Sequence, residues 1–220
     1  MVKPDEIIRS NRKTLAITID GNNRLIVRAP YRCGEERIFA FLNSKEDWIL
    51  RKRAEKAAVG IVLPPQNLHG YELLLLGEKC KIFLTETDKI GYDEQQSCIY
   101  LPLKNAEVRL KKWLKENALR IFTSVVERKS AQMGVAYKSV TVTSARSRWG
   151  SCSFDNALRF SFRLLYAPKE IIEYVAVHEL SHVRYKNHSK AFWTEVEKYV
   201  PDWKIKRNWL KKHGGLMGVF

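Results

Sequence analysis

The chain has 220 residues, of which 45% are hydrophobic and 29% charged, and its formal net charge is +15 at pH 7. This length can bury a core in one large or two small domains, and the composition excludes a disordered or fibrous protein. No run approaches the roughly 18 apolar residues of a membrane-spanning helix, and the first residues lack the apolar core of a secretion signal. We therefore expect no membrane partner and a cytoplasmic location. The four cysteines, which include no C-x-x-C pair, are expected to be reduced thiols, as is usual in the cytoplasm.

Residues 1–104 are expected to form a β-rich N-terminal region. Apolar segments at 15–19 and 25–28 flank a turn sequence and predict a hairpin. Helices are expected near 35–58, where Ser44 stands three residues before Asp47, a spacing typical of a helix start that divides the segment into two helices. Three apolar runs separated by glycine-containing turns predict further strands, at 71–76, 80–84 and 98–101.

Residues 105–220 are expected to form a second domain. Apolar residues recur at helical spacing over 106–133, with Val108, Leu114 and Phe122 among them, and predict one long helix. Three segments that follow are expected to be the strands of a small antiparallel sheet, at 138–143, 147–153 and 157–165. Helical pattern resumes after Pro168, so the sequence predicts an α+β protein.

The predicted helix after Pro168 carries the sequence His178-Glu179-Leu180-Ser181-His182. Positions i and i+4 lie one turn apart on the same face, so two imidazoles can reach one metal ion while Glu179 lies beside it. Both histidines continue the apolar stripe of Ile171 and Val175 toward the interior. The pattern predicts a zinc site, because burying these histidines with a carboxylate and no metal would cost several kcal/mol. The alternative is a set of core histidines that each form a hydrogen bond.

A third protein ligand would leave one coordination position open, as catalytic zinc sites do. His188 is the first candidate, but six helical residues would rotate it about 240° away from the metal, so the helix must end before it. Asn187 could end the helix in the left-handed conformation, and Ser189 could cap the next helix. Glu195 is the alternative third ligand.

Several of these motifs, in this order, closely resemble the YgjP-like metal-dependent hydrolases, a zincin-type family related to the SprT-like proteases. The matching stretches are SARSRWGSCS at 144–153, YVAVHELSH at 174–182, NHSKAFW at 187–193 and WLKKHG at 209–214, with RKT at 12–14 and SKEDWI at 44–49 in the first half. The resemblance implies a zincin-like domain with zinc on His178, His182 and His188 and with Glu179 as the catalytic residue. It does not identify the substrate.

The positive charge is concentrated in the second half of the chain. Residues 1–104 hold 17 Lys and Arg against 14 Asp and Glu, a balance of +3, whereas residues 105–220 hold 22 against 10, a balance of +12. Such a positive field attracts anions, and nucleic acid is one candidate partner. The simpler interpretation of the charge is that the lysines and arginines lie on solvated helix faces. The resemblance places Arg146 and Arg148 beside the metal cleft, so both, with Trp149, are candidates for substrate binding.

The sequence therefore predicts a zinc-dependent hydrolase, most simply a metallopeptidase acting on polypeptides, with Glu179 as general base. Hydrolysis of nucleoside triphosphate anhydrides is an alternative that uses the same metal chemistry and the basic second half. A nucleic-acid-associated module with a structural zinc is the third possibility. Glu179 argues against it, because a structural site has no use for a general base.

Overall fold

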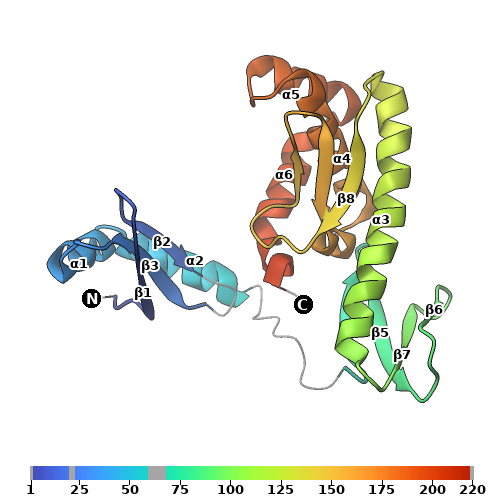
Figure 1. Cartoon of the computed structure of the whole chain (residues 1–220), viewed down its shortest axis with the longest axis horizontal. Helices are drawn as coiled ribbons and strands as arrows, with labels where there is room; N and C mark the ends of the chain where they lie inside the picture. Colours follow the sequence, from blue (N-terminus) through green and yellow to red (C-terminus); the bar gives the residue numbers. More distant parts are fainter. Residues whose placement is uncertain (1, 20–22, 59–67, 219–220) are drawn as a thin grey trace. The chain divides into compact units, whose positions relative to one another are not determined.

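The computed structural model describes residues 2–19, 23–58 and 68–218 (Figure 1). Its contacts divide the chain into two compact units, Met1–Leu63 and Pro64–Phe220. The division thus falls near residue 63 instead of the expected 104, because the strands between 72 and 102 pack with the helix that follows them. No helix of the described residues is both long and apolar enough to cross a lipid bilayer.

The first unit is built on a three-stranded sheet. Its central strand, β3 (Leu25–Pro30), pairs antiparallel with β2 (Ala16–Ile19), which confirms the predicted strand pair. The turn predicted at residues 20–22 lies outside the described residues. On its other edge β3 pairs in parallel with β1 (Glu6–Ser10), a strand that the sequence analysis did not predict.

Two helices complete the first unit, α1 (Glu35–Asn43) and α2 (Glu46–Ala58). Alternate residues of β3 are buried against apolar residues of both helices, including Ile38, Leu42 and Ile49. The predicted division into two helices at Ser44 is confirmed, but Ser44 does not have the predicted role of a cap for the second helix. Ser44 ends α1, and its hydroxyl donates to the Phe41 carbonyl oxygen at 2.8 Å instead of capping α2.

The second unit begins with a four-stranded sheet in the order β4-β5-β7-β6. Its strands are β4 (Glu72–Leu75), β5 (Glu78–Thr85), β6 (Gly91–Asp93) and β7 (Cys98–Pro102). The β4–β5 turn holds Gly77 at φ +87°, and a Cβ there would lie 2.9 Å from Cγ of Pro168. The Leu76 N–H also donates to the Leu165 carbonyl oxygen at 2.7 Å, so this turn is fixed against the start of the motif helix.

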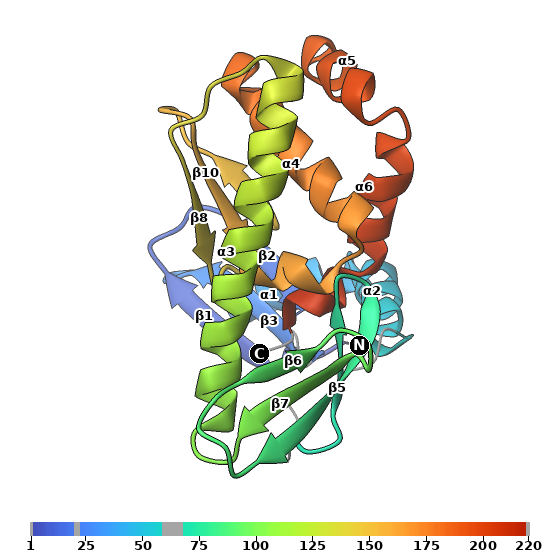
Figure 2. The same ribbon diagram turned by 90° about the vertical axis from the view of Figure 1, so that its right-hand side faces the viewer.

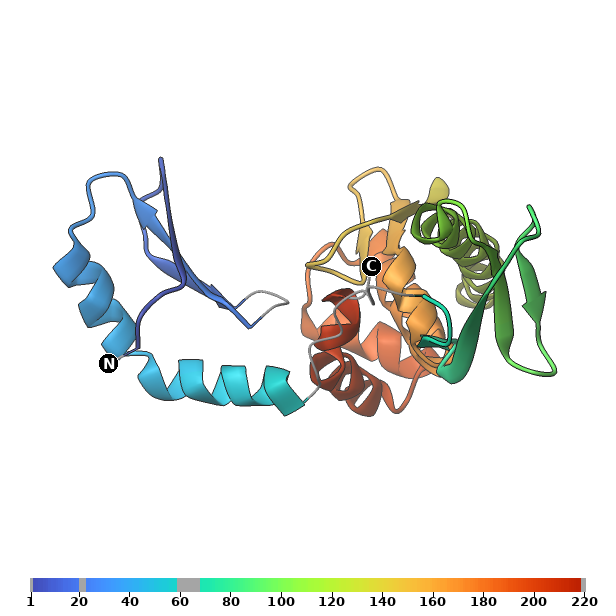
Figure 3. The same ribbon diagram turned by 90° about the horizontal axis from the view of Figure 1, so that it is seen from below.

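The long helix α3 (Ala106–Met133) has the predicted bounds and connects the parts of the second unit. Figure 1 shows the four-stranded sheet at one end of α3 and a smaller sheet beside its other end. Contacts with β7 and with the motif helix confirm that α3 spans both regions. Figure 3, in which α3 is seen nearly end-on, shows it between the four-stranded sheet and the motif helix. Its buried residues include Leu114 and Phe122, whereas Val108 is 69% exposed and does not belong to the apolar side.

The smaller sheet has the order β8-β10-β9. Its strands are β8 (Ser139–Thr143), β9 (Gly150–Cys152) and β10 (Ala157–Ser161). The expected antiparallel sheet is instead mixed, because β8 and β10 run parallel and only β9 and β10 are antiparallel. The third predicted strand is also shorter than expected, since residues 162–166 form the 3₁₀ helix η1 (Phe162–Tyr166). Consequently β9 is an edge strand of this sheet.

Three α-helices and a 3₁₀ helix complete the chain: α4 (Lys169–Arg184), α5 (Lys190–Tyr199), α6 (Trp203–Lys212) and η2 (Gly214–Gly218). Helix α4 contacts α3, β9, α5 and α6. In Figure 2 it lies between the small sheet with α3 on one side and α6 on the other. This central position buries most of α4 and fixes the direction in which its histidines point.

Candidate metal centre

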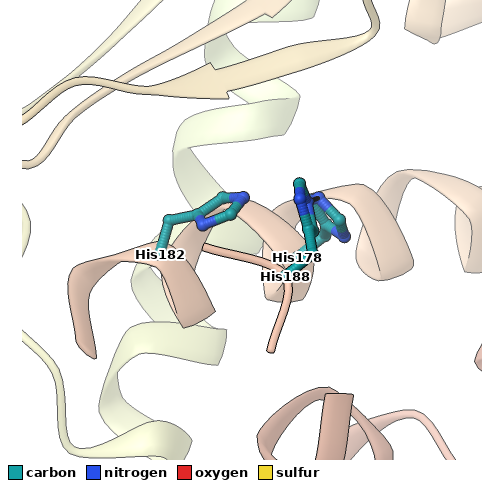
Figure 4. Close-up of side chains that lie close together, drawn as sticks. All are labelled: His178, His182 and His188. Atoms are coloured by element: carbon teal, nitrogen blue, oxygen red, sulfur yellow. Dashed lines mark hydrogen bonds between the residues drawn. The ribbon is translucent and has the colours of Figure 1, made fainter. Parts of the chain in front are cut away.

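Helix α4 brings His178 and His182 to one face, one turn apart. Their ring centroids lie 5.1 Å from each other (Figure 4). The helix begins directly after Pro168, whose carbonyl oxygen accepts from the Ile171 and Ile172 N–H groups at 3.0 and 3.2 Å. Proline suits this position because it has no N–H to leave unpaired and its φ is already fixed.

The helix ends before His188, as the sequence analysis requires. Tyr185 leaves the helical conformation with φ −126° and ψ 100°, and Ser189 caps α5 by accepting from the Phe192 N–H at 3.4 Å. The prediction that Asn187 takes the left-handed conformation is wrong, because its φ is not positive. Its side-chain oxygen instead accepts from the Ser189 N–H at 3.3 Å.

Because the helix ends here, His188 lies next to His178 and His182. One ring nitrogen from each of the three imidazoles can be chosen so that all lie within 4.8 Å of one another. The Nε2 atoms of His178 and His188 are 3.0 Å apart. Zinc–nitrogen distances of about 2.0–2.1 Å in a tetrahedral site place ligand nitrogens roughly 3.3 Å apart. The three side chains are therefore arranged as ligands of a single ion.

The protonation of the imidazoles also fits a metal. Nδ1 of His182 lies 2.9 Å from the Tyr185 carbonyl oxygen, which can only accept, so Nδ1 carries the proton and Nε2 keeps its lone pair. Burial, with the neighbouring His182 and His188, lowers the pKa of His178 to about 3, and burial also lowers the pKa of His182. Neutral imidazoles are the form that binds metal ions.

Phe192 of α5 packs against all three histidines. Its ring centroid lies 4.9 Å from that of His178, 4.5 Å from that of His182 and 4.8 Å from that of His188. The side chain is completely buried. An apolar ring in this place keeps water from one side of the imidazoles and limits their rotation. Phe192 was not predicted as a site residue, although it is the third residue after the Ser189 cap.

Glu179 is buried against the edge strand β9. Its exposed fraction is 5%, and burial raises the pKa of its carboxyl group to about 8, while the positive charge of Arg148 acts in the opposite direction. A Cβ on Gly150 would lie 2.6 Å from Glu179 Oε1. Only a glycine at this position leaves room for the carboxyl group, so the backbone of β9 lies directly beside it.

A cleft of about 650 Å³ opens beside the histidines and Glu179. Of the predicted substrate-binding residues, Trp149 lines this cleft. Arg146 and Arg148 do not line it. Arg148 acts on Glu179 through its charge, and the charge of Arg146 acts on Arg163, whose guanidinium donates to the Ser144 carbonyl oxygen at 3.0 Å.

Glu195, the alternative third ligand, has other partners. Its buried carboxylate accepts from Arg184 of α4 and, at 3.0 Å, from Lys198 of its own helix. Several residues that line the cleft were not predicted as site residues, among them Tyr174, Trp193, Arg207 and Lys211. The spacing of four between Arg207 and Lys211 was available as a signal, because it places both on one face of a helix.

Three converging imidazoles beside a buried glutamate in an open cleft are the arrangement of a metal-dependent hydrolase. The chain belongs to the YgjP-like family, since the model of the YgjP-like metallopeptidase domain matches residues 13–213. It is thus a metal-dependent peptidase in general terms, as the resemblance in the sequence implies. No curated protein matches the chain.

Two metallopeptidase zymogens are among the solved structures that are similar to part of this chain. The metallopeptidase zymogen abylysin of Pyrococcus abyssi is 23% identical, with 41% of this chain and 93% of that chain covered at a TM-score of 0.38. The metallopeptidase zymogen jannalysin of Methanocaldococcus jannaschii is 21% identical, with 41% and 91% covered at a TM-score of 0.36.

Proposed function

We propose that the protein is a zinc-dependent peptidase in which His178, His182 and His188 hold the metal and Glu179 is the general base. The observation that carries the proposal is the convergence of three imidazole nitrogens within 4.8 Å, next to the buried carboxyl group. Zinc is the expected ion because an all-imidazole, four-coordinate site suits it, and when bound it supplies a Lewis acid and lowers the pKa of a coordinated water.

Glu179 takes the proton that the attacking water loses and passes it to the leaving amide nitrogen as the peptide C–N bond breaks. The surroundings of this carboxyl group act in opposite directions: burial favours its protonated form, whereas the charge of Arg148 favours the carboxylate. Trp149 and the edge of β9 offer the surface along which an extended polypeptide would lie.

Replacement of Glu179 by glutamine tests the proposal. The amide keeps the shape but cannot accept a proton, so we expect zinc content to be retained and turnover of an unfolded polypeptide to fall about 10²–10⁴-fold. Metal analysis and mass spectrometry of the cleavage products measure the two effects. Glu170→Gln, an exposed change on the same helix, is the matched control and should behave as wild type.

His182→Ala should remove the metal and the activity together, since it deletes one of three ligands. The same preparations are assayed with nucleoside triphosphates. Metal-dependent release of pyrophosphate by the wild type, with no peptide cleavage, would replace the peptidase proposal by the alternative hydrolase. Full activity of zinc-loaded Glu179→Gln would show that another group is the base.

A further inference from the structure

The cleft beside the metal centre has two different walls. On one side lie Trp149 and Gly150 at the edge strand β9, and the cleft is also lined by His178 and Glu179 of α4 and by His188. The opposite wall is the face of α6 that carries Arg207, Leu210 and Lys211. Helix α6 lies across α4 from the small sheet (Figure 2), so a substrate that follows β9 would direct some of its side chains toward this basic wall.

Arg207 is held close to the histidines by an aromatic ring. Its guanidinium carbon lies 5.1 Å from the centroid of Trp193, and that ring stacks on His188 with centroids 5.6 Å apart. These two distances together limit the separation of Arg207 from His188 to about 11 Å, or roughly three residues of extended chain. A guanidinium group placed over an aromatic ring can still donate hydrogen bonds from its N–H groups.

Among the residues that the structure describes, the positive charges of this wall have no ion-pair partner, apart from that of Lys206. Lys206 of the same helix pairs with Asp202 at 2.6 Å. Within the described part of the chain, neither Arg207 nor Lys211 forms an ion pair, and Glu179 is the only carboxylate that lines the cleft. Like charges four residues apart on a helix repel each other. An anion bound between them would remove this repulsion.

We propose that Arg207 and Lys211 select polypeptide substrates that carry a carboxylate within about three residues of the cleaved bond. This inference rests on the peptidase function proposed above. The carboxylate is supplied either by an acidic side chain or by the C-terminus of the substrate. The edge of Arg207 provides two parallel N–H donors for it, and Lys211 adds a positive charge one turn further along α6.

The test uses one peptide sequence in matched versions. Aspartate is placed in turn at each of the three positions on either side of the cleaved bond, and the corresponding asparagine peptide is its neutral partner. Each peptide is made with a free and with an amidated C-terminus, which separates the two sources of the carboxylate. For the zinc-loaded full-length protein we expect kcat/KM to be about tenfold higher for the preferred carboxylate peptide than for its neutral partner.

Arg207→Gln, Lys211→Gln and the double variant are compared with Lys212→Gln. Lys212 is an exposed lysine on the same helix that does not line the cleft, so its replacement removes the same charge elsewhere. We expect the ratio between carboxylate and neutral peptides to fall to about one in the double variant and to stay unchanged in the control. Cleavage of the neutral peptide should stay unchanged in the Lys212→Gln control. An equal ratio in wild type and double variant overturns the proposal.

A binding measurement separates this inference from the peptidase function itself. Fluorescence anisotropy of the labelled peptides on zinc-loaded Glu179→Gln reports the same selectivity without turnover. If no peptide is cleaved but carboxylate peptides bind more tightly through Arg207 and Lys211, only the proposed function fails. If peptides are cleaved without carboxylate preference, only the selectivity fails. Unlabelled carboxylate peptide and inorganic pyrophosphate are also compared as competitors of the labelled peptide. If pyrophosphate displaces it at a far lower concentration, the basic wall binds phosphate and the carboxylate proposal is wrong.

Discussion

Gly150 and Glu179 show how little space the candidate site leaves at the level of single residues. The backbone of β9 approaches the buried carboxyl group so closely that a methyl group would lie 2.6 Å from Oε1 and 2.8 Å from Cγ. Contacts under about 3 Å must be relieved by movement, and the buried glutamate has little space into which to move. Gly150 therefore determines where the proton acceptor of the proposed reaction lies.

Gly150→Ala should displace Glu179 without removing any metal ligand. We expect zinc content to be unchanged and turnover to fall by up to about 10²-fold, the usual cost of misplacing a catalytic group by ~1 Å. Thermal unfolding should show a loss of roughly 1–3 kcal/mol from the crowded core. Gly91→Ala is the control, because a Cβ there meets Tyr100 only at an ordinary 3.7 Å. Wild-type turnover by Gly150→Ala would contradict this account.

The convergence of the three histidines could be predicted from the sequence because their spacing is itself the physical requirement. His178 and His182 need only a helix, and His188 needs only a helix that ends in time. The role of Gly150 could not be predicted. It depends on the distance between a strand and a helix that are separated in the sequence, and no local pattern encodes that distance. Arg148 illustrates the same limit, since it acts on Glu179 by its charge instead of lining the cleft.

At the scale of elements, Glu195 connects the helices on both sides of the His188 loop. Its buried carboxylate binds Arg184 at the end of α4, and the same guanidinium donates to the Met133 carbonyl oxygen at the end of α3, at 2.7 Å. Lys198 of α5 forms a second ion pair with the Glu195 carboxylate, at 3.0 Å. Glu195 thus connects α5 to the end of α4, the two helices on either side of the loop that carries His188.

Glu195→Gln should weaken metal binding from a distance. Loss of the buried charge leaves Arg184 without its ionic partner, and because Arg184 is 39% exposed we expect a moderate stability loss of about 1–3 kcal/mol. Zinc affinity should fall about tenfold or more, as is typical when a group that supports a ligand is removed. A competition titration with a zinc chelator measures this, with the exposed Glu197→Gln on the same helix as control. Unchanged affinity would show that the loop holds His188 without this connection.

Local patterns predicted most elements, and the differences have identifiable causes. The long helix α3 has the expected bounds because its apolar stripe and the Gly134 that follows it are local signals. The parallel pairing of β8 with β10 was missed, since strand direction depends on how distant segments meet. Short strands such as β1 and β6 were missed because three to five residues carry little periodicity.

At the scale of the whole molecule, the balance of +12 over residues 105–220 predicts attraction to polyanions. We propose nucleic acid as a partner on this ground, and its affinity should fall steeply as salt is added because bound phosphates release counterions. Anisotropy of labelled single- and double-stranded DNA between about 50 and 200 mM salt measures the slope. Absence of binding at the lowest salt would leave the charge as a solvated surface.

The division of the chain near residue 63 makes a further prediction about which fragment folds. The four-stranded sheet contacts α3 through β7, and its Gly77 turn is fixed against Pro168 and Leu165 at the start of α4. Removing that sheet would expose the apolar side of α3 and leave the start of the motif helix without support. The metal centre therefore depends on residues well before the boundary at 104 that the sequence suggested.

A fragment of residues 64–220 should fold and bind zinc as the full chain does, because all three histidines and their supporting contacts lie within this unit. A fragment of residues 105–220 should be largely unfolded, since it lacks the sheet whose strands β7 and β4 contact α3 and η1. Circular dichroism, thermal unfolding and zinc titration of the two fragments compare them directly. A cooperatively folded, zinc-binding 105–220 fragment would mean that the four-stranded sheet is an accessory to the metal centre and not part of its scaffold.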